Sequence, residues 1–308
     1  MRPRGLLEWS SLALAALAAA AVGVWLLSAP RPAFTEADAP ALVIAGNPER
    51  GRLIFAAGNC ASCHASTGQQ DRLRLGGGMA LASPFGTFRV PNISPDPIDG
   101  IGRWRTIDLA NALMSGVSPD GSHFYPALPY TSYAHMQVDD VRDLMAYIRS
   151  LPPVSGQAPP HEISFPFNIR RFVGLWKLFY LNQERLQPDA SRSTAWNRGR
   201  YLAEALGHCA ECHSSRNLFG AIRPETRFAG GQDPEGTGFV PNITPGRIGS
   251  WSSAEIAEVL TSGHTPMRDN VGSTMVDVVT NTAMLPQTDR EALAVYIKSL
   301  PARPTPRP

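Results

Sequence analysis

The sequence predicts a mostly α-helical protein in which two tandem copies of one domain, with long loops, follow an N-terminal transmembrane helix. Four sequence blocks recur in the same order at an offset of about 150 residues, which indicates an internal duplication. Helical periodicity recurs in both copies, whereas the sequence contains no long alternating pattern typical of β-strands. A long uncharged stretch near the N-terminus supplies the third observation.

The uncharged N-terminal stretch runs from Trp9 to Ala29, after a start that contains Arg2 and Arg4. Its length matches the roughly 20 apolar residues that a helix needs to cross a bilayer. We expect residues 1–30 to be an uncleaved anchor, with a cleaved export signal as the alternative. The basic start predicts a cytoplasmic N-terminus. In either case the remainder of the chain is delivered across the membrane.

The repeated blocks set the boundaries of the two predicted domains. ERGRLIFAAGNCASCHA pairs with NRGRYLAEALGHCAECHS, VPNISPD with VPNITPG, IGRW with IGSW, and DDVRDLMAYIRSLP with TDREALAVYIKSLP. We expect each domain to have a core of its own. The predicted segments are a linker over 31–46, a first domain over 47–152, a connector over 153–195, a second domain over 196–302 and a tail over 303–308.

Each predicted domain contains three helices joined by loops. The first helix leads into the cysteine motif, the second follows a Trp and ends at a Gly, and the third ends before a Pro. In the third helix of the first domain, Val141, Leu144, Met145 and Ile148 lie on one apolar stripe. The 28 prolines and 27 glycines predict extensive turns between these helices.

Composition excludes two classes of protein. Hydrophobic residues make up 43% of the chain and charged residues 18%, which indicates a globular rather than a disordered protein. The formal net charge is only +2, and no basic run exceeds two residues. Nucleic acid is therefore not an expected partner.

All the cysteines of the chain occur in two Cys-x-x-Cys-His motifs. This pattern is typical of covalent haem attachment, in which two thiols bind the haem and the adjacent His ligates the iron. Structural zinc needs four ligands, and a thioredoxin-like dithiol normally occurs in a βαβ unit. The predicted export, the duplicated motif and the helical surroundings favour haem over both of these alternatives. The predicted haem-binding residues are Cys60, Cys63, Cys209 and Cys212, with His64 and His213 as iron ligands.

Both halves resemble class I cytochrome c domains, with the motif after one helix and a Tyr near the end of the last helix. The segments PFGTF, PNISPD, GIGRW, YPALPY and AYIRSLP resemble those of the cytochrome c subunits of periplasmic membrane-bound dehydrogenases for alcohols and gluconate. The resemblance covers roughly residues 47–302. Those subunits usually carry three haem domains, whereas this chain has two motifs.

The resemblance implies a function and a location. It implies two covalently bound haem c groups, which carry electrons from a dehydrogenase subunit to quinone, another cytochrome or an oxidase of the respiratory chain. It also implies a place on the periplasmic side of the bacterial inner membrane, with the N-terminal helix in the membrane. The alternative hypothesis is a dihaem redox enzyme of the peroxidase or thiosulfate dehydrogenase type, which needs an open or displaceable iron position.

For the second haem, the resemblance suggests that the sixth ligand is the Met of GSTMVDVV, which is Met275. A Met opposite the His is the usual arrangement for electron transfer and raises the reduction potential. The same loop also offers Met267, Met284 and His264, of which Met267 is the next candidate.

The first domain departs from the pattern that it resembles. Leu128 stands where a ligating Met is often found in Tyr-Pro-Ala-Met-Pro-Tyr. We expect Met136 to be the sixth ligand of the first haem. The alternatives are His123 or His135, Met79 in the glycine-rich loop, and an open iron position.

Three further features have both a structural and a functional interpretation. Trp104 and Trp251 are expected to pack beside the haem edges, and Asn92 and Asn242 to turn the loop or to reach a propionate. The connector segment 161–182 is rich in aromatic and aliphatic residues and has no counterpart in the repeat. It is expected to pack the two domains together, with an exposed surface for a partner subunit or the membrane as the alternative.

Overall fold

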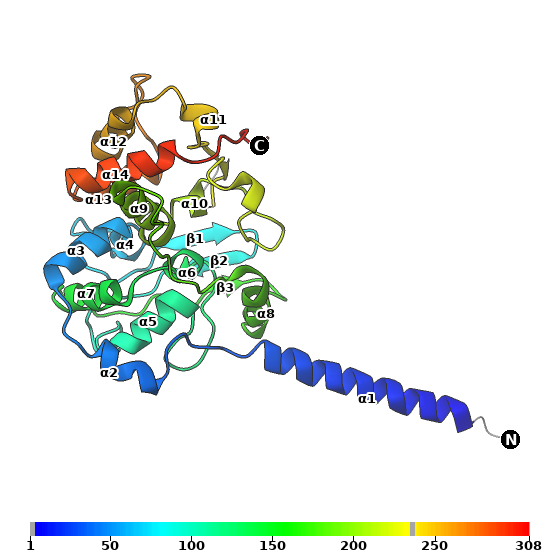
Figure 1. The fold of residues 1–308 in the computed structure, drawn as a ribbon. Helices are drawn as coiled ribbons and strands as arrows, with labels where there is room; N and C mark the ends of the chain where they lie inside the picture. Colours follow the sequence, from blue (N-terminus) through cyan, green and yellow to red (C-terminus); the bar gives the residue numbers. More distant parts are fainter. Residues whose placement is uncertain (1–3, 235–237, 308) are drawn as a thin grey trace.

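The computed structural model describes residues 4–234 and 238–307; Arg2, on which part of the orientation prediction depends, lies outside them. The long helix α1 (Arg4–Leu27) projects from a mostly helical body (Figure 1). Within it, Trp9–Leu27 is long and apolar enough to cross a membrane. This segment is the candidate membrane anchor.

The first half of the body comprises residues 31–182. It holds three principal helices and a short three-stranded antiparallel sheet, in which Ala80 pairs with Arg89, and Gly86 pairs with Ile163. The elements are α2 (Ala39–Leu42), α3 (Pro48–Ala57), α4 (Cys60–His64), β1 (Ala80–Ser83), β2 (Gly86–Arg89), α5 (Thr106–Ser115), α6 (Tyr130–Tyr133), α7 (Val138–Arg149), β3 (Glu162–Ile163) and α8 (Arg171–Tyr180).

The second half comprises residues 183–307 and repeats the order of the principal helices. A π-helical turn over Leu202–Leu206 extends its first helix toward the cysteine motif. The elements are α9 (Thr194–Tyr201), α10 (Cys209–Cys212), β4 (Gly231–Gln232), β5 (Phe239–Val240), α11 (Pro245–Ile248), α12 (Ser253–Ser262), α13 (Met275–Thr282) and α14 (Gln287–Lys298).

The predicted helix ends and apolar stripe are confirmed. Helices α5 and α12 stop before Gly116 and Gly263, which adopt the left-handed conformation (φ 60° and 78°) that favours glycine at a helix end. On α7 the four residues of the predicted stripe are buried. The apolar periodicity therefore identified the face that packs into the core.

In each half the first and last helices cross at a glycine. Helix α3 packs on α7 at Gly51, and α9 packs on α14 at Gly199. A Cβ atom at Gly51 would overlap the carbonyl of Asp143, and one at Gly199 would overlap the carbonyl of Ala292. The missing side chain lets the two backbones approach closely.

We expect Gly199→Ala to destabilise the protein. Alanine gains up to about 1 kcal/mol of helix propensity over glycine. Overpacking typically lowers the free energy of unfolding by about 1–3 kcal/mol. Here the added methyl group would overlap the backbone carbonyl of Ala292, which cannot rotate away as a side chain can. The net loss should appear as a lower denaturation midpoint in chemical unfolding of the holoprotein. Gly272→Ala is the matched control, because no atom lies within 4 Å of the added Cβ; equal midpoints for both variants would contradict the prediction.

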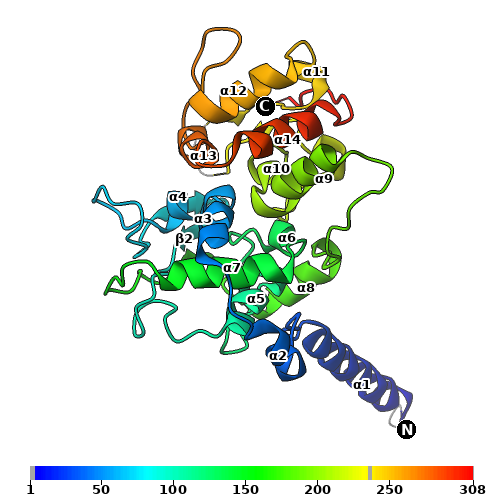
Figure 2. The same ribbon diagram turned by 60° about the vertical axis from the view of Figure 1, so that its left-hand side comes forward.

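The expectation that each half has its own core is wrong. The larger hydrophobic cluster is continuous across the two halves, since it contains Ile54 and Met145 of the first together with Leu206 and Leu293 of the second. A smaller cluster around Ile297 belongs to the second half alone. Figure 2 shows the second half stacked on the first, with α13 next to α4. The two halves therefore bury apolar surface against each other.

Candidate cofactor site

The first cysteine motif forms the short helix α4, directly after α3. Asn59 joins the two helices in a left-handed conformation (φ 54°). This reversal starts a new helical turn, so that Cys60 and Cys63 lie one turn apart. At the end of α4, the ring Nδ1 of His64 lies 2.9 Å from the carbonyl oxygen of Pro91.

The second motif has the same geometry. His208 takes the place of Asn59 and is also left-handed (φ 39°). Cys209 and Cys212 begin and end helix α10. The ring Nδ1 of His213 lies 2.7 Å from the carbonyl oxygen of Pro241. The two motifs are therefore locally equivalent.

The contacts of His64 and His213 fit an axial iron ligand. A carbonyl oxygen only accepts hydrogen bonds, so each Nδ1 carries the proton and each Nε2 keeps a lone pair for a metal. Burial lowers the pKa of both rings, although the proline carbonyls raise it, which favours the neutral form that binds iron. Sequence reasoning assigned no role to Pro91 and Pro241, although both lie in the repeated VPNI segment.

The environment of the cysteines fits thioethers better than thiolates. Burial raises the pKa of the Cys60 and Cys209 thiols to about 12. Among the described residues, no disulfide joins the four cysteines. No group of three or more His, Cys, Asp and Glu side chains in the described part of the chain is arranged to hold a metal ion. The raised thiol pKa disfavours the thiolate that zinc binding and dithiol redox chemistry both need, whereas a haem thioether is uncharged.

The candidate Met ligands differ in burial. Met136 is 1% exposed and lies in the continuous core, next to α6. Met275 begins α13 and packs against the same core. By contrast, Met267 and Met284 are 72% and 46% exposed. The partial burial of Met275 against the core favours it over both, because the bond between iron and a Met sulfur in an electron-transfer centre is shielded from water.

The histidines that were candidate ligands have other partners. His123 is buried, with Nε2 2.9 Å from the carbonyl of Ser28 and Nδ1 3.1 Å from Nζ of Lys177. Both of its ring nitrogens are therefore engaged away from the motif. His135 contacts the carbonyl of Glu184 through Nδ1, at 2.5 Å. The structure thus gives no support to a ligand role for His123.

Asn92 and Asn242 turn the loops that carry the two prolines. The side-chain oxygen of Asn92 accepts from the amide of Ser94, and its Nδ2 donates to the carbonyls of Val154 and Gly156. Asn242 makes equivalent bonds in the second half. Since both amide protons are used, these residues serve the loop rather than a propionate. Trp104 and Trp251 pack against the two clusters, as expected for packing residues.

The two motifs lie next to each other across the contact between the halves. The ring of His208 stacks edge-on against Tyr133, and its Nε2 lies 3.4 Å from the carbonyl of Gly58. From α13, Asn281 donates to the side chain of Asn59 and, at 3.1 Å, to Ser62 Oγ. The residues that flank one motif therefore contact those that flank the other.

A buried carboxylate strengthens this contact. Glu211 lies inside the second motif, and its side chain is hydrogen-bonded by Thr131 (2.7 Å) and Ser132 (3.4 Å) of α6. Arg216 forms an ion pair with it at 2.6 Å. Burial raises the pKa of Glu211. The contacts with Arg216 and Thr131 lower this pKa, and the lowering prevails, so that the net shift is downward. The charged form links the two halves.

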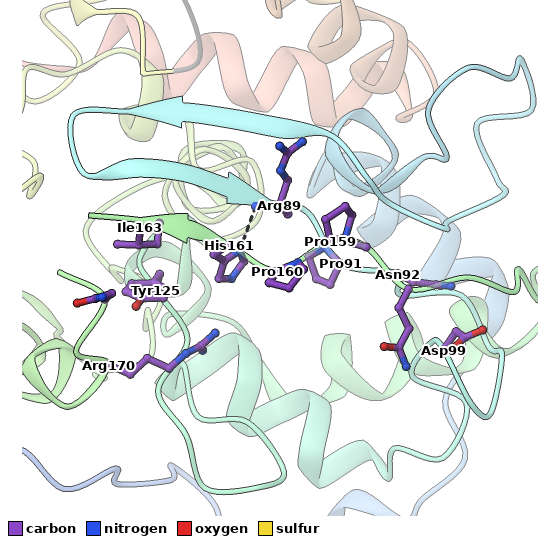
Figure 3. A pocket seen from close by; sticks show the side chains of 13 residues that line it. Arg89, Pro91, Asn92, Asp99, Tyr125, Pro159, Pro160, His161, Ile163 and Arg170 are labelled. Carbon is purple, nitrogen blue, oxygen red and sulfur yellow. Dashed lines mark hydrogen bonds between the residues drawn. The ribbon is translucent and has the colours of Figure 1, made fainter. Parts of the chain in front are cut away.

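The first half also contains a cavity of about 540 Å³, shown in Figure 3. Pro91 and Tyr125 line it, together with Arg89 and Arg170. Arg89 is paired with Glu162, and Arg170 lies over the ring of Tyr125 at 5.0 Å. The lining contains no residue of either cysteine motif. The motifs, and not this cavity, are therefore the main candidate site.

Comparisons with known proteins agree with this site. A cytochrome c family model matches residues 48–152. A dihaem cytochrome c-type protein of Cereibacter sphaeroides is 48% identical over 95% of this chain and 97% of its own length. The fructose dehydrogenase cytochrome subunit of Gluconobacter japonicus is 35% identical over 82% of this chain, and the cytochrome c subunit of quinone-type alcohol dehydrogenase of Gluconobacter oxydans is 32% identical over 93%. This chain spans 52% and 60% of the lengths of those two subunits.

The helical fold and the Cys-x-x-Cys-His motifs define a haem c-binding protein. The chain belongs to the cytochrome c family and, within it, to the dihaem c-type cytochromes. Its function is electron transfer. The predicted resemblance to the cytochrome subunits of dehydrogenases is confirmed.

Proposed function

We propose that the chain is a membrane-anchored relay that carries electrons from a dehydrogenase subunit, through two haems, to the respiratory chain. Each half is a cytochrome c domain with one covalently bound haem, over residues 47–152 and 196–302. The acceptor is quinone, another cytochrome or an oxidase. The haem domains lie on the periplasmic side of the inner membrane, with α1 as the anchor.

The residues of the chain hold and insulate the two redox centres. When bound, haem c supplies one-electron chemistry at its iron. Cys60 and Cys63 would hold the first haem, with His64 oriented by its carbonyl partner as the fifth ligand. The corresponding residues in the second half are Cys209, Cys212 and His213. We propose Met136 and Met275 as the sixth ligands.

The observation that carries the proposal is the contact between the two motifs. Electron tunnelling falls steeply with distance, so a relay needs its centres close together and held rigidly. His208 and Glu211 contact Gly58 and Thr131 of the other half, and the core is continuous across the same boundary. This arrangement fixes the distance between the motifs. Relatives such as the fructose and alcohol dehydrogenase cytochrome subunits support a dehydrogenase as the donor.

A stopped-flow experiment tests the relay against the enzyme hypothesis. The reduced full-length holoprotein is expected to pass two electrons per chain to an excess of oxidised soluble cytochrome c. It should not turn over hydrogen peroxide or thiosulfate, and carbon monoxide should leave its reduced spectrum unchanged because both sixth positions are filled. Rapid carbon monoxide binding together with turnover of either substrate would favour a dihaem enzyme instead.

A further inference from the structure

The end of α1 is locked onto α8. The guanidinium group of Arg171 donates to Ser28 Oγ at 2.9 Å and to the carbonyl of Trp25 at 2.5 Å, and it lies 4.1 Å from the centre of the Trp25 ring. A Cβ atom at Gly174 would overlap the carbonyl of Ser28. The carbonyl of Ser28 also contacts the buried ring of His123. Helix α8 is therefore held against the last turn of α1.

Trp25 marks the level of this contact in a bilayer. Trp9 and Trp25 are exposed near the two ends of the apolar part of α1. They are 16 residues apart, which corresponds to about 24 Å of helix and is comparable with a hydrocarbon core of about 30 Å. Tryptophan concentrates at the two interfaces of a membrane. A helix held against Trp25 lies at the headgroup level.

Around this point the body exposes large apolar side chains. Phe179 on α8 is 80% exposed, and Leu218 in the second half is 90% exposed. The turn that carries Leu218 is fixed to α8, because Trp176 Nε1 donates to the carbonyl of Phe219 at 2.9 Å. We define the apolar platform as Phe165, Phe167, Phe172, Phe179, Leu218 and Phe219, all of which are exposed.

Helix α8, which carries part of the platform, lies on the side of the body from which α1 projects. Figure 1 shows α8 beside the end of α1 that joins the body, and Figure 2 shows the same neighbourhood from another direction. The segment from residue 163 to residue 183 contains no acidic residue, and its Arg170 is exposed. Arg171 is engaged with the end of α1, and Nζ of Lys177 is turned inward to the carbonyls of Ser115 and Gly116. Exposed apolar side chains with interspersed basic residues are typical of segments that lie in the headgroup region of anionic membranes.

We propose that the apolar platform inserts into the headgroup region of the bilayer next to α1 and is a second membrane contact of the protein. The inference rests on the proposed anchoring by α1. With two contacts, the body cannot swing freely about the end of the helix. The first half, which follows the helix directly, is then held at a fixed height above the lipid.

Photochemical labelling of lipid tests the platform in the full-length holoprotein. p-Benzoylphenylalanine replaces Phe179 or Leu218, and the protein is reconstituted in vesicles of phosphatidylcholine and phosphatidylglycerol. The same probe at Leu17 of α1 is the positive control. Met267 is the matched negative control, since it is 72% exposed and lies in the loop between α12 and α13, far from α1.

We expect the yield of lipid adducts at positions 179 and 218 to be at least about five-fold higher than the yield at position 267, as for side chains that reach the acyl boundary. An unchanged haem spectrum confirms that each variant is folded. Labelling at 17 with only background at 179 and 218 would overturn the platform and leave the anchor intact. Background labelling at 17 would instead overturn the anchor. Adducts between two copies of the chain at 179 or 218, without lipid, would show that the face is covered by protein.

Discussion

Replacing both Cys209 and Cys212 with Ala is expected to halve the covalently bound haem of the purified protein. Covalent attachment needs the thiols of the motif itself, so the first site should keep its haem. Intact-mass spectrometry of the denatured protein measures the haem count directly. The mirror variant, with Cys60 and Cys63 replaced, should lose the other haem. Retention of two haems, or an acid-extractable haem in the unaltered protein, would contradict covalent attachment at these motifs.

The same variant should also lower the stability of both halves. The hydrophobic cluster that contains Leu206 and Leu293 continues into the first half around Ile54. A void at the second site removes packing partners from this shared cluster. We therefore expect one cooperative unfolding transition at lower denaturant for the remaining haem and for the helices. An unchanged transition of the first-half haem would show that the halves unfold independently.

Met275→Ala is expected to remove the sulfur ligand of the second haem and to lower one of two reduction potentials. Axial ligands tune haem potentials over roughly 0.8 V, so loss of the Met should lower the reduction potential of the second haem by an amount on the order of 0.1 V. The far-red charge-transfer band of the oxidised protein should weaken at the same time. Met267→Ala, at an exposed position in the same loop, is the control and should change neither property.

Met136→Ala should change the other reduction potential, that of the first haem, in a redox titration of the holoprotein. Two separate steps are expected in the unaltered protein, with the first haem at the lower potential, because Met136 lies only two residues before α7 and the loop that presents it is short. A loop of this kind holds the sulfur less firmly. Unchanged steps and spectra in Met136→Ala would show that another residue ligates the first iron.

Much of the fold was predictable from local pattern. The helix ends at Gly116 and Gly263, the buried stripe of α7 and the apolar span of α1 each depend on neighbours a few residues apart. The sequence also located the two cysteine motifs, because their spacing is set by the chemistry of one short turn. The roles of Pro91 and Pro241 were not predicted, since their carbonyls meet histidines 27 and 28 residues away.

By itself the sequence indicated haem attachment at the two motifs, the recurrence of the sequence blocks and the apolar span near the N-terminus, since each depends on residue type and spacing along the chain. Only the tertiary structure decided how these parts meet. It joined the two halves in one core, placed Glu211 against Thr131, and set α8 against the last turn of α1. Such contacts depend on the packing of surfaces that are distant in the chain, and no local pattern encodes which surfaces pair.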